Sequence, residues 1–269
     1  GRSLREVRGH QMAKAALECA ALDAGLRAEG RSLASFLGAT RPVVPTGIAL
    51  GLAPHLDDVV DAVLRWHGQG HRAFKIKIQP GWDVEPLRAI RSEVGDEVAL
   101  LADANGSFRS DSVEHLARLG RVADASIGLV ALEQPFAPES IGSLAQLDTA
   151  LTLDACRAVS LKAGRVGGLV EARRIHQRCR DAGVALRCGG MLETGLGRAL
   201  NLAVAALPGC NLPPDLGPSA RYYSRDLTPP FESRGGSMLV PSGPWLGVSP
   251  DPEALEDITI DQRTLRTDK

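Results

Sequence analysis

One pattern constrains this chain more than any other: a short β-prone run followed by a helical run, recurring about every 26 to 30 residues. The β-prone runs lie at 44–51, 73–78, 98–102, 127–132, 157–161 and 184–187. Helical periodicity fills several of the intervals, at 56–66, 84–94 and 169–181. Strands that alternate with helices are typical of parallel βα units, so the sequence predicts an α/β fold of the (β/α) barrel kind.

Five of the six β-prone runs end alike, with an ionisable residue or a glycine turn at the end of the apolar stretch. These endings are Lys77, Asp103, Glu133, Lys162 and the turn at 188–190. Because the carboxyl ends of barrel strands converge on one mouth, the recurrence predicts an active site there. Each charge taken alone could also be a solvated loop start, and only the repetition in successive units favours a site.

The number of strands falls short of a closed barrel. With a short run at 210–212 the chain offers seven candidates, whereas a parallel barrel closes with eight. The crowded place lies between Glu133 and Lys162, where a helical run at 139–148 is followed almost at once by the next strand. Either the barrel is irregular there or a βα segment is missing.

The flanks of the barrel region follow other patterns. Small and apolar residues recur at helical spacing over 11–29, and Gly30 ends the run, which predicts one helix. After about Pro213 the alternation stops, and the chain becomes rich in Pro, Gly and Ser with a β-like piece at 238–241. We interpret this last part as an appendage of the barrel.

Composition excludes several classes of partner. The formal charge is −1, which gives no electrostatic footprint for nucleic acid or an anionic membrane. No apolar stretch approaches the roughly 20 residues that cross a bilayer. The five cysteines show no paired metal spacing and form a poor disulfide framework, which favours the reducing cytoplasm. We therefore expect a cytoplasmic protein whose partner is a small molecule.

Lys75 and Lys77 lie two residues apart on one predicted strand, so their side chains share a face. Inside a barrel, burial and the neighbouring like charge would both lower a lysine pKa, and an amine of lowered pKa can act as a general base. The alternative is an exposed edge strand with two solubilising lysines. The apolar neighbours Phe74, Ile76 and Ile78 favour an interior strand.

Asp103 and Glu133 end two successive strands and offer the hard oxygen ligands that Mg²⁺ prefers, with Asn105 close by. Two carboxylates are few for such a site, and Asp154 is poorly placed to be a third because it lies too close to the strand that ends at Lys162. In a closed barrel Lys162 would face Lys77 across the mouth. Lys162 could equally be a structural lysine before a glycine-rich turn.

The segment 188–195 leads from a strand into a helix, and its backbone N–H groups could receive a substrate carboxylate. We interpret Cys188 as a packing residue, since the sequence places no histidine near it. The histidines fall mostly on helices or before strands, which does not suggest metal ligands.

Five segments together resemble the o-succinylbenzoate synthase and N-succinylamino acid racemase family of the enolase superfamily. They are Lys75-Ile-Lys77-Ile-Gln-Pro-Gly-Trp-Asp83, Asp103-Ala-Asn105, Glu133-Gln-Pro135, Leu161-Lys162-Ala-Gly-Arg-Val-Gly-Gly168 and Cys188-Gly-Gly-Met-Leu-Glu-Thr-Gly-Leu-Gly-Arg198. The resemblance runs from about residue 9 to residue 255, and the combination of motifs is specific. It implies an enolase-superfamily barrel, a modified TIM barrel, acting on a small carboxylate with Mg²⁺ or another divalent cation such as Mn²⁺.

The resemblance also implies roles for single residues. The catalytic pair is Lys77 as general base and Lys162 as the opposing lysine, and the metal ligands are Asp103 and Glu133, with Asn105 supporting the metal site. The expected substrate-binding residues are Lys75, Gly189, Gly190 and Met191.

The activity implied first is that of o-succinylbenzoate synthase, a carbon–oxygen lyase of menaquinone biosynthesis that dehydrates 2-succinyl-6-hydroxy-2,4-cyclohexadiene-1-carboxylate. The alternative is racemisation of N-succinylamino acids or other N-acylamino acids by proton transfer between two lysines. A third possibility is an inactive barrel remnant without metal. We also expect a homo-oligomer.

Departures from the family pattern guide the expected organisation. Most of the family's N-terminal α+β capping domain is absent from this sequence, so 1–43 is expected to be its remnant with a connecting helix. The barrel is expected at 44–212 and a C-terminal segment, packed on both, at 213–269. Ala49 stands where many members have serine, and Trp245 interrupts a usual Gly-Pro-Gly turn.

A strand with a Leu-Asp-Glu-Ser motif, which carries the third metal ligand in the family, is missing near 148–153. If it is absent from the molecule, the metal site is incomplete. Since loss of a barrel strand would expose backbone groups and core, we expect a break in the backbone between Asp148 and Asp154 where residues are omitted. Continuous backbone geometry there would contradict this expectation.

Overall fold

The computed structural model describes residues 7–137 and 144–264. The first helix, α1, spans Gln11–Ala28, and Gly30 at φ 61° follows its end, which confirms the helix predicted over 11–29. A short helix, α2 (Leu33–Leu37), comes next, with the Ser32 side chain accepting a hydrogen bond from the Ser35 N–H at its start. The two helices bring the chain to the first strand.

Four parallel strands form the larger sheet: β2 (Ile48–Leu50), β3 (Ala73–Lys77), β4 (Ala99–Asp103) and β5 (Leu129–Glu133), in that spatial order. The sequence placed the last three within two residues. In the register of the sheet, Lys77 lies opposite Asp103, and Asp103 lies opposite Glu133. The carboxyl ends of three strands therefore bring one amine and two carboxylates into a row.

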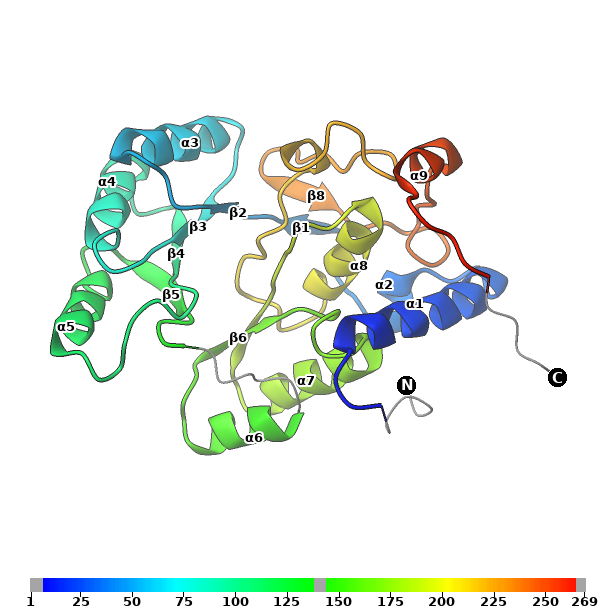
Figure 1. Ribbon diagram of the computed structural model, residues 1–269, viewed down its shortest axis with the longest axis horizontal. Helices are drawn as coiled ribbons and strands as arrows, with labels where there is room; N and C mark the ends of the chain where they lie inside the picture. Colours follow the sequence, from blue (N-terminus) through cyan, green and yellow to red (C-terminus); the bar gives the residue numbers. More distant parts are fainter. Residues whose placement is uncertain (1–6, 138–143, 265–269) are drawn as a thin grey trace.

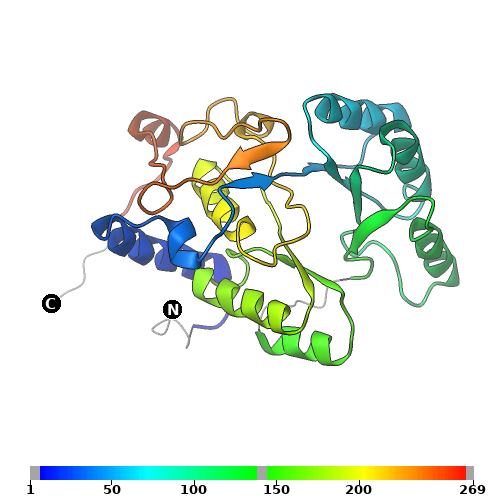
Figure 2. The same ribbon diagram turned by 180° about the vertical axis from the view of Figure 1, so that it is seen from behind.

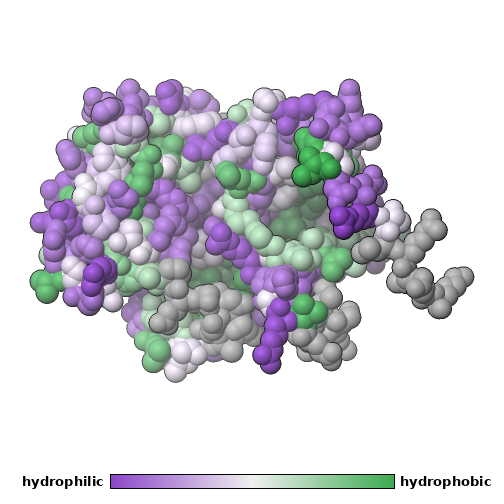
Figure 3. Space-filling view, viewed as in Figure 1, coloured by the Kyte–Doolittle hydropathy of each residue, from purple (hydrophilic) through white to green (hydrophobic). Residues whose placement is uncertain are grey.

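Helices α3 (Leu56–Gly68), α4 (Val84–Val94) and α5 (Val113–Val122) connect these strands and lie together on one side of the sheet (Figure 1). Hydrophilic side chains cover most of this part of the surface in the view of Figure 3. The apolar faces of the three helices and the sheet enclose one core, which includes Phe74, Leu87 and Ile127.

A second parallel pair follows, β6 (Ala158–Leu161) with β7 (Ala185–Cys188). Helices α6 (Leu144–Thr152), α7 (Leu169–Asp181) and α8 (Gly195–Ala205) belong to this half. The predicted helix over 139–148 begins outside the described residues, and its described part extends four residues further than expected. These elements share a second apolar core with α1, α2 and the C-terminal segment.

The run at 44–51 is two strands, so its prediction as one barrel strand was wrong. Its first part, β1 (Val43–Pro45), pairs antiparallel with β8 (Ser237–Leu239), as Figure 2 shows, and only β2 joins the parallel sheet. Gly47 lies between them, and a Cβ there would come within 3.0 Å of the Pro214 carbonyl oxygen. The absence of a side chain at Gly47 allows this close approach at the point where the chain passes from one sheet to the other.

The C-terminal segment packs against the N-terminal one. Leu33 N–H donates to the Trp245 carbonyl at 2.6 Å and Trp245 N–H donates to the Arg31 carbonyl at 2.9 Å. Trp245 adopts φ 55°, in the left-handed region that favours glycine, which fits its place in a turn where the family has Gly-Pro-Gly. A last helix, α9 (Pro252–Ile258), is capped by Asp251.

The strand expected at 210–212 is absent from the structure, and an irregular segment takes its place. Leu212 N–H donates to the Leu186 carbonyl of β7 at 3.2 Å, and Gly47 N–H donates to the Pro214 carbonyl at 2.7 Å. These bonds connect β7 with the start of β2. The barrel is thus joined on this side without a regular ladder.

The other side of the barrel is open, since no strand of the described residues pairs with both β5 and β6. The backbone is continuous past the end of α6: Leu153 N–H donates to the Thr149 carbonyl at 3.0 Å and Ala155 N–H to the Ala150 carbonyl at 2.8 Å. The expected break between Asp148 and Asp154 is therefore wrong. Helix α6 leads directly into β6, and the described part of the chain supplies no strand for the position between β5 and β6.

Candidate active site

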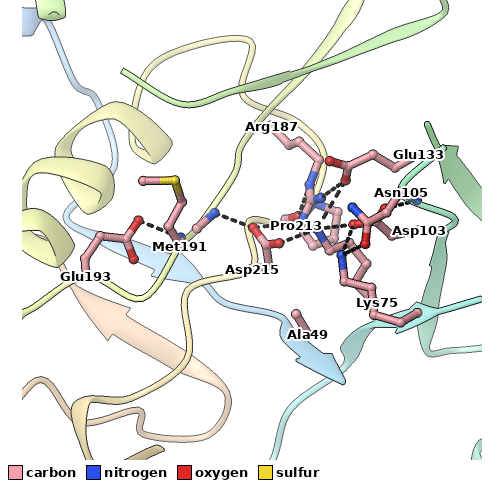
Figure 4. Close-up of polar contacts among 12 residues, drawn as sticks. Ala49, Lys75, Asp103, Asn105, Glu133, Arg187, Met191, Glu193, Pro213 and Asp215 are labelled. Atoms are coloured by element: carbon pink, nitrogen blue, oxygen red, sulfur yellow. Dashed lines mark hydrogen bonds and ion pairs between the residues drawn. The ribbon is translucent and has the colours of Figure 1, made fainter. Parts of the chain in front are cut away.

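Charged side chains from both halves meet at the carboxyl ends of the strands (Figure 4). The larger sheet supplies Lys75, Lys77, Asp103 and Glu133, as the sequence predicted. Strand β3 lies between β2 and β4, and every one of its residues except Lys77 is buried, so the alternative of an exposed edge strand does not apply.

Lys75 occupies the centre of this cluster. Its Nζ lies 2.5 Å from Asp215 Oδ2 and 3.2 Å from both Asp103 Oδ2 and Glu133 Oε2, and the side chain is only 5% exposed. Burial lowers the pKa of Lys75, but the charges of Asp215 and Glu133 outweigh it, and the net shift of the pKa is upward. The expected lowering of the pKa of this lysine was therefore wrong, because the carboxylates were not counted.

Lys77 lies nearer to solvent. Its Nζ contacts Asp103 Oδ2 at 2.6 Å and Asn105 Oδ1 at 2.5 Å. The Asn105 backbone N–H also donates to Asp103 Oδ1 at 3.0 Å. Burial would raise the pKa of Asp103, but the two lysines hold that pKa below its ordinary value, so this acid stays ionised. Asn105 thus orients both an acid and an amine.

Arg187 and Asp215 belong to the cluster, and sequence reasoning missed both. Arg187 Nη1 contacts Glu133 Oε2 at 2.9 Å, and its Nη2 contacts Asp215 Oδ1 at 3.3 Å. Arg187 Nε donates to the Pro213 carbonyl at 3.0 Å. Burial raises the pKa of Asp215, but Arg187 and Lys75 more than offset it, leaving the pKa lowered. Ion pairs therefore connect the two halves of the barrel.

Lys162 directly follows β6, and its half-buried ammonium has no carboxylate within 4.0 Å among the described residues. Burial lowers the pKa of Lys162, and the charge of Lys75 acts in the same direction, against the attraction of Asp215 and Glu133. Next to it Ser160 Oγ is buried without a hydrogen-bond partner in the described chain. The amine of Lys162 thus reaches the electrostatic field of the cluster from the second half, in surroundings that favour its neutral form more than water does.

The turn after β7 does not offer free N–H groups to a ligand. Gly189 N–H donates to the Leu161 carbonyl at 2.9 Å, Gly190 N–H to Asp215 Oδ1 at 2.5 Å and Met191 N–H to Glu193 Oε1 at 2.6 Å. We expected these amides to bind a substrate carboxylate, but each of them already donates a hydrogen bond within the protein. A substrate would have to displace one of them.

Other residues singled out from the sequence lie away from the cluster or take part in packing. Cys188 is fully buried, and burial raises the pKa of its thiol well above the ordinary value. His71 bonds to the Thr46 carbonyl and Ser233, and His176 bonds to the Pro208 carbonyl. Asp154 pairs with Arg157 on the surface. Within the described part of the chain, no hydrogen bond or ion pair joins these four groups to the acid cluster, although the charge of Asp215 acts on the Cys188 thiol.

Gly189 controls the position of Lys162. A Cβ at Gly189 would lie 2.6 Å from Lys162 Cε and 2.8 Å from Ser160 Oγ, whereas a Cβ at Gly190 would lie 2.2 Å from the Asp215 backbone oxygen. We expect Gly189→Ala to displace the amine and lower turnover by about 10²-fold with little change in melting temperature. Gly190→Ala, which meets backbone, should lower the melting temperature in thermal unfolding. Equal melting losses in both variants would contradict this assignment.

Comparison with known proteins identifies the class. A family model described as "Enolase C-terminal domain-like" matches residues 58–153 and 136–254. The two stretches overlap over 136–153. A solved structure of an enolase-superfamily member of unknown function from Enterococcus faecalis superposes with a TM-score of 0.87 at 35% identity, covering 94% of this chain and 73% of that one. The chain belongs to the enolase superfamily, and the predicted barrel class is confirmed.

Two curated relatives narrow the assignment. An N-succinylamino acid racemase from Amycolatopsis is 43% identical over 95% of this chain and 74% of its own length. An o-succinylbenzoate synthase from Geobacillus kaustophilus is 38% identical over 94% of this chain and 72% of its own length. Within the superfamily the chain belongs to the o-succinylbenzoate synthase and N-succinylamino acid racemase group, so the predicted family is confirmed and the chain is of an enzyme family.

Enzymes of this superfamily use Mg²⁺ beside a lysine or histidine base. In the described part of this chain, no three His, Cys, Asp or Glu side chains form a group that could hold a metal ion. Asp103 and Glu133 adjoin as expected, but Lys75 contacts both carboxylates. The donor set of the described residues therefore does not fit a divalent ion.

The helices of the described residues include none long and apolar enough to cross a membrane.

Proposed function

We propose that this chain removes a proton next to a substrate carboxylate with the amines of Lys77 and Lys162, and that its reaction is the dehydration catalysed by o-succinylbenzoate synthases. One observation carries the proposal: the two lysines come from different sheets and border the same group of charges. The similarity to synthases at 38% identity supports the reaction type.

The protein's own groups account for the proton transfers. A neutral lysine accepts the proton from the carbon next to the carboxylate, and the electron pair of that bond moves into the ring. Hydroxide then leaves the ring carbon with its bonding electrons, takes up a proton to become water, and the ring becomes aromatic. The ammonium groups at the mouth stabilise the negative charge that develops on the substrate.

Racemisation of N-succinylamino acids is the second candidate, because the relative at 43% identity is an N-succinylamino acid racemase. In this reaction one lysine takes the α-proton from one face of the substrate and the other returns a proton to the opposite face. The same two amines serve both reactions. The difference lies in whether a leaving group stands next to the carbanion.

Two assays separate these functions. The first follows dehydration of 2-succinyl-6-hydroxy-2,4-cyclohexadiene-1-carboxylate, and the second follows exchange of the α-proton of N-succinylamino acids with D₂O. Dehydration is the expected result, and exchange without dehydration would favour the racemase. Absence of both activities in folded protein would contradict the proposal and favour a non-catalytic barrel. A role in menaquinone biosynthesis, a cytoplasmic location and homo-oligomerisation stay predictions.

The pH profile tests the role of Lys162. Turnover should rise with pH and level off below 10.5, the ordinary lysine pKa, because burial lowers the pKa of Lys162. The stability of the fold should change in the same direction. Because the pKa of Lys162 is lower in the folded than in the unfolded state, the free energy of unfolding rises as pH rises from the folded-state pKa toward the unfolded-state pKa. Steady-state rates across pH check the prediction, with Lys162→Arg as the variant that should lose the rise. A flat wild-type profile would argue against it.

A further inference from the structure

Three carboxylates converge on one ammonium group in this chain. Lys75 Nζ contacts Asp103, Glu133 and Asp215 at 3.2, 3.2 and 2.5 Å, and the lysine is nearly inaccessible to solvent. The acids come from β4, from β5 and from the irregular segment after α8. The positive charge of Lys75 is thus shared by acids from three separate parts of the barrel.

The carboxylate oxygens are also committed elsewhere. Both oxygens of Asp103 accept hydrogen bonds, Oδ1 from Asn105 N–H and Oδ2 from Lys77. Both oxygens of Asp215 are likewise used, Oδ1 by Gly190 N–H and Oδ2 by Lys75. Few carboxylate oxygens therefore remain free for the six-oxygen coordination that Mg²⁺ prefers.

Arg187 completes the neutralisation of the acids, because it contacts Glu133 Oε2 and Asp215 Oδ1. Three carboxylates therefore face three cations, Lys75, Lys77 and Arg187. The protein's own cations thus neutralise the three acids before any metal is added, and a divalent ion would have to displace an ammonium or guanidinium group.

We propose that Lys75, assisted by Arg187, takes the place of the divalent cation in this chain, so that the site binds a small carboxylate without metal. The carboxylate part rests on the proposed function, with Lys77 and Lys162 receiving the anion. The proposal that Lys75 excludes a metal ion does not depend on the proposed function.

Calorimetry on chelator-treated wild-type protein tests the exclusion directly. Mg²⁺ should give no saturable heat up to about 10 mM, above the roughly millimolar range of weak protein sites. Succinate, the probe for the carboxylate, should bind with the same affinity within twofold in EDTA and in Mg²⁺. Saturable Mg²⁺ binding that Asp103→Asn abolishes, or succinate binding that requires Mg²⁺, would overturn the proposal.

A pair of variants tests the part played by Lys75. Lys75→Met leaves the three carboxylates without their shared cation. Mg²⁺ should then bind saturably to this variant and raise the melting temperature of the variant protein. Lys77→Met, whose amine contacts only one of these acids, should show neither effect. A folded Lys75→Met protein that binds no Mg²⁺ contradicts the proposal. If this variant does not fold, the wild-type titration decides.

The proposed function fails in a different way. Absence of succinate binding to the wild type under every condition counts against carboxylate binding and the proposed function, while the Mg²⁺ titration still decides whether Lys75 excludes the metal.

Discussion

Lys77→Ala and Lys162→Ala should each lower turnover by about 10³-fold or more and leave the fold intact. Removal of a positioned general base typically costs between about 10² and 10⁴ in rate. Lys77 is 31% exposed and Lys162 is half-buried, so neither truncation opens a large internal cavity. Steady-state kinetics on each variant, together with thermal unfolding, gives the two quantities to compare.

Lys14 provides the matched control, since its ammonium contacts only the Val7 carbonyl near the start of α1 among the described residues. Lys14→Ala should keep turnover within about twofold of the wild type, because its amine is remote from the mouth. Near-normal turnover in Lys77→Ala would remove that residue from the reaction. Normal turnover in Lys162→Ala would do the same for its partner.

Arg187→Met should lower the free energy of unfolding by about 3 to 5 kcal/mol, the usual cost of leaving a buried charge without its partner. The arginine is 3% exposed, and its guanidinium contacts carboxylates of Glu133 and Asp215. Methionine keeps much of the side-chain volume, so the change reports the charge more than the packing. Urea unfolding followed by circular dichroism measures the difference.

Two further variants separate this effect from a general loss of positive charge. Arg187→Lys keeps the positive charge but not the combined contacts with Glu133, Asp215 and the Pro213 carbonyl. Its free energy of unfolding should lie between those of the wild type and Arg187→Met. Arg109→Met breaks a pair with Asp111 in which both side chains are largely exposed, and should change stability little. A loss in Arg187→Met no larger than in Arg109→Met would show that the two halves do not depend on this guanidinium.

Much of the site could be predicted from the sequence because its chemistry lies at strand ends. Lys75 and Lys77 share a face by strand parity, and Asp103 and Glu133 occupy the same register in the next two strands. A count of residues would have strengthened the prediction, since the chain has only five lysines and three of them lie in this cluster.

The missed residues have identifiable physical reasons. Asp215 lies in an irregular segment beyond the last helix of the βα series, where periodicity carries no information. Arg187 lies within β7 and not past its end, so a search limited to strand ends overlooks it. Its position between Leu186 and Cys188 was a usable signal, because a charged residue inside a buried strand needs a partner.

The division of 44–51 into two strands was also beyond pattern reading. The apolar and β-branched residues are continuous over this run, and propensity alone does not show that β1 pairs with a segment almost two hundred residues away. Pro45 ends β1 and Gly47 turns the chain toward β2. Tertiary pairing, which the local sequence does not encode, decided where each part went.

No strand of the described residues joins β5 to β6, so the contacts of the candidate site also help to hold the two halves together. Each half buries its own apolar residues, whereas the described contacts at the mouth that cross from one half to the other include the ion pairs of Lys75 and Arg187. Better packing within either half would make that half more rigid without tightening the mouth. If the proposed reaction takes place here, the ion pairs of Lys75 and Arg187 help to hold the two halves at the spacing that Lys77 and Lys162 need, beside the backbone hydrogen bond from Gly47 to Pro214.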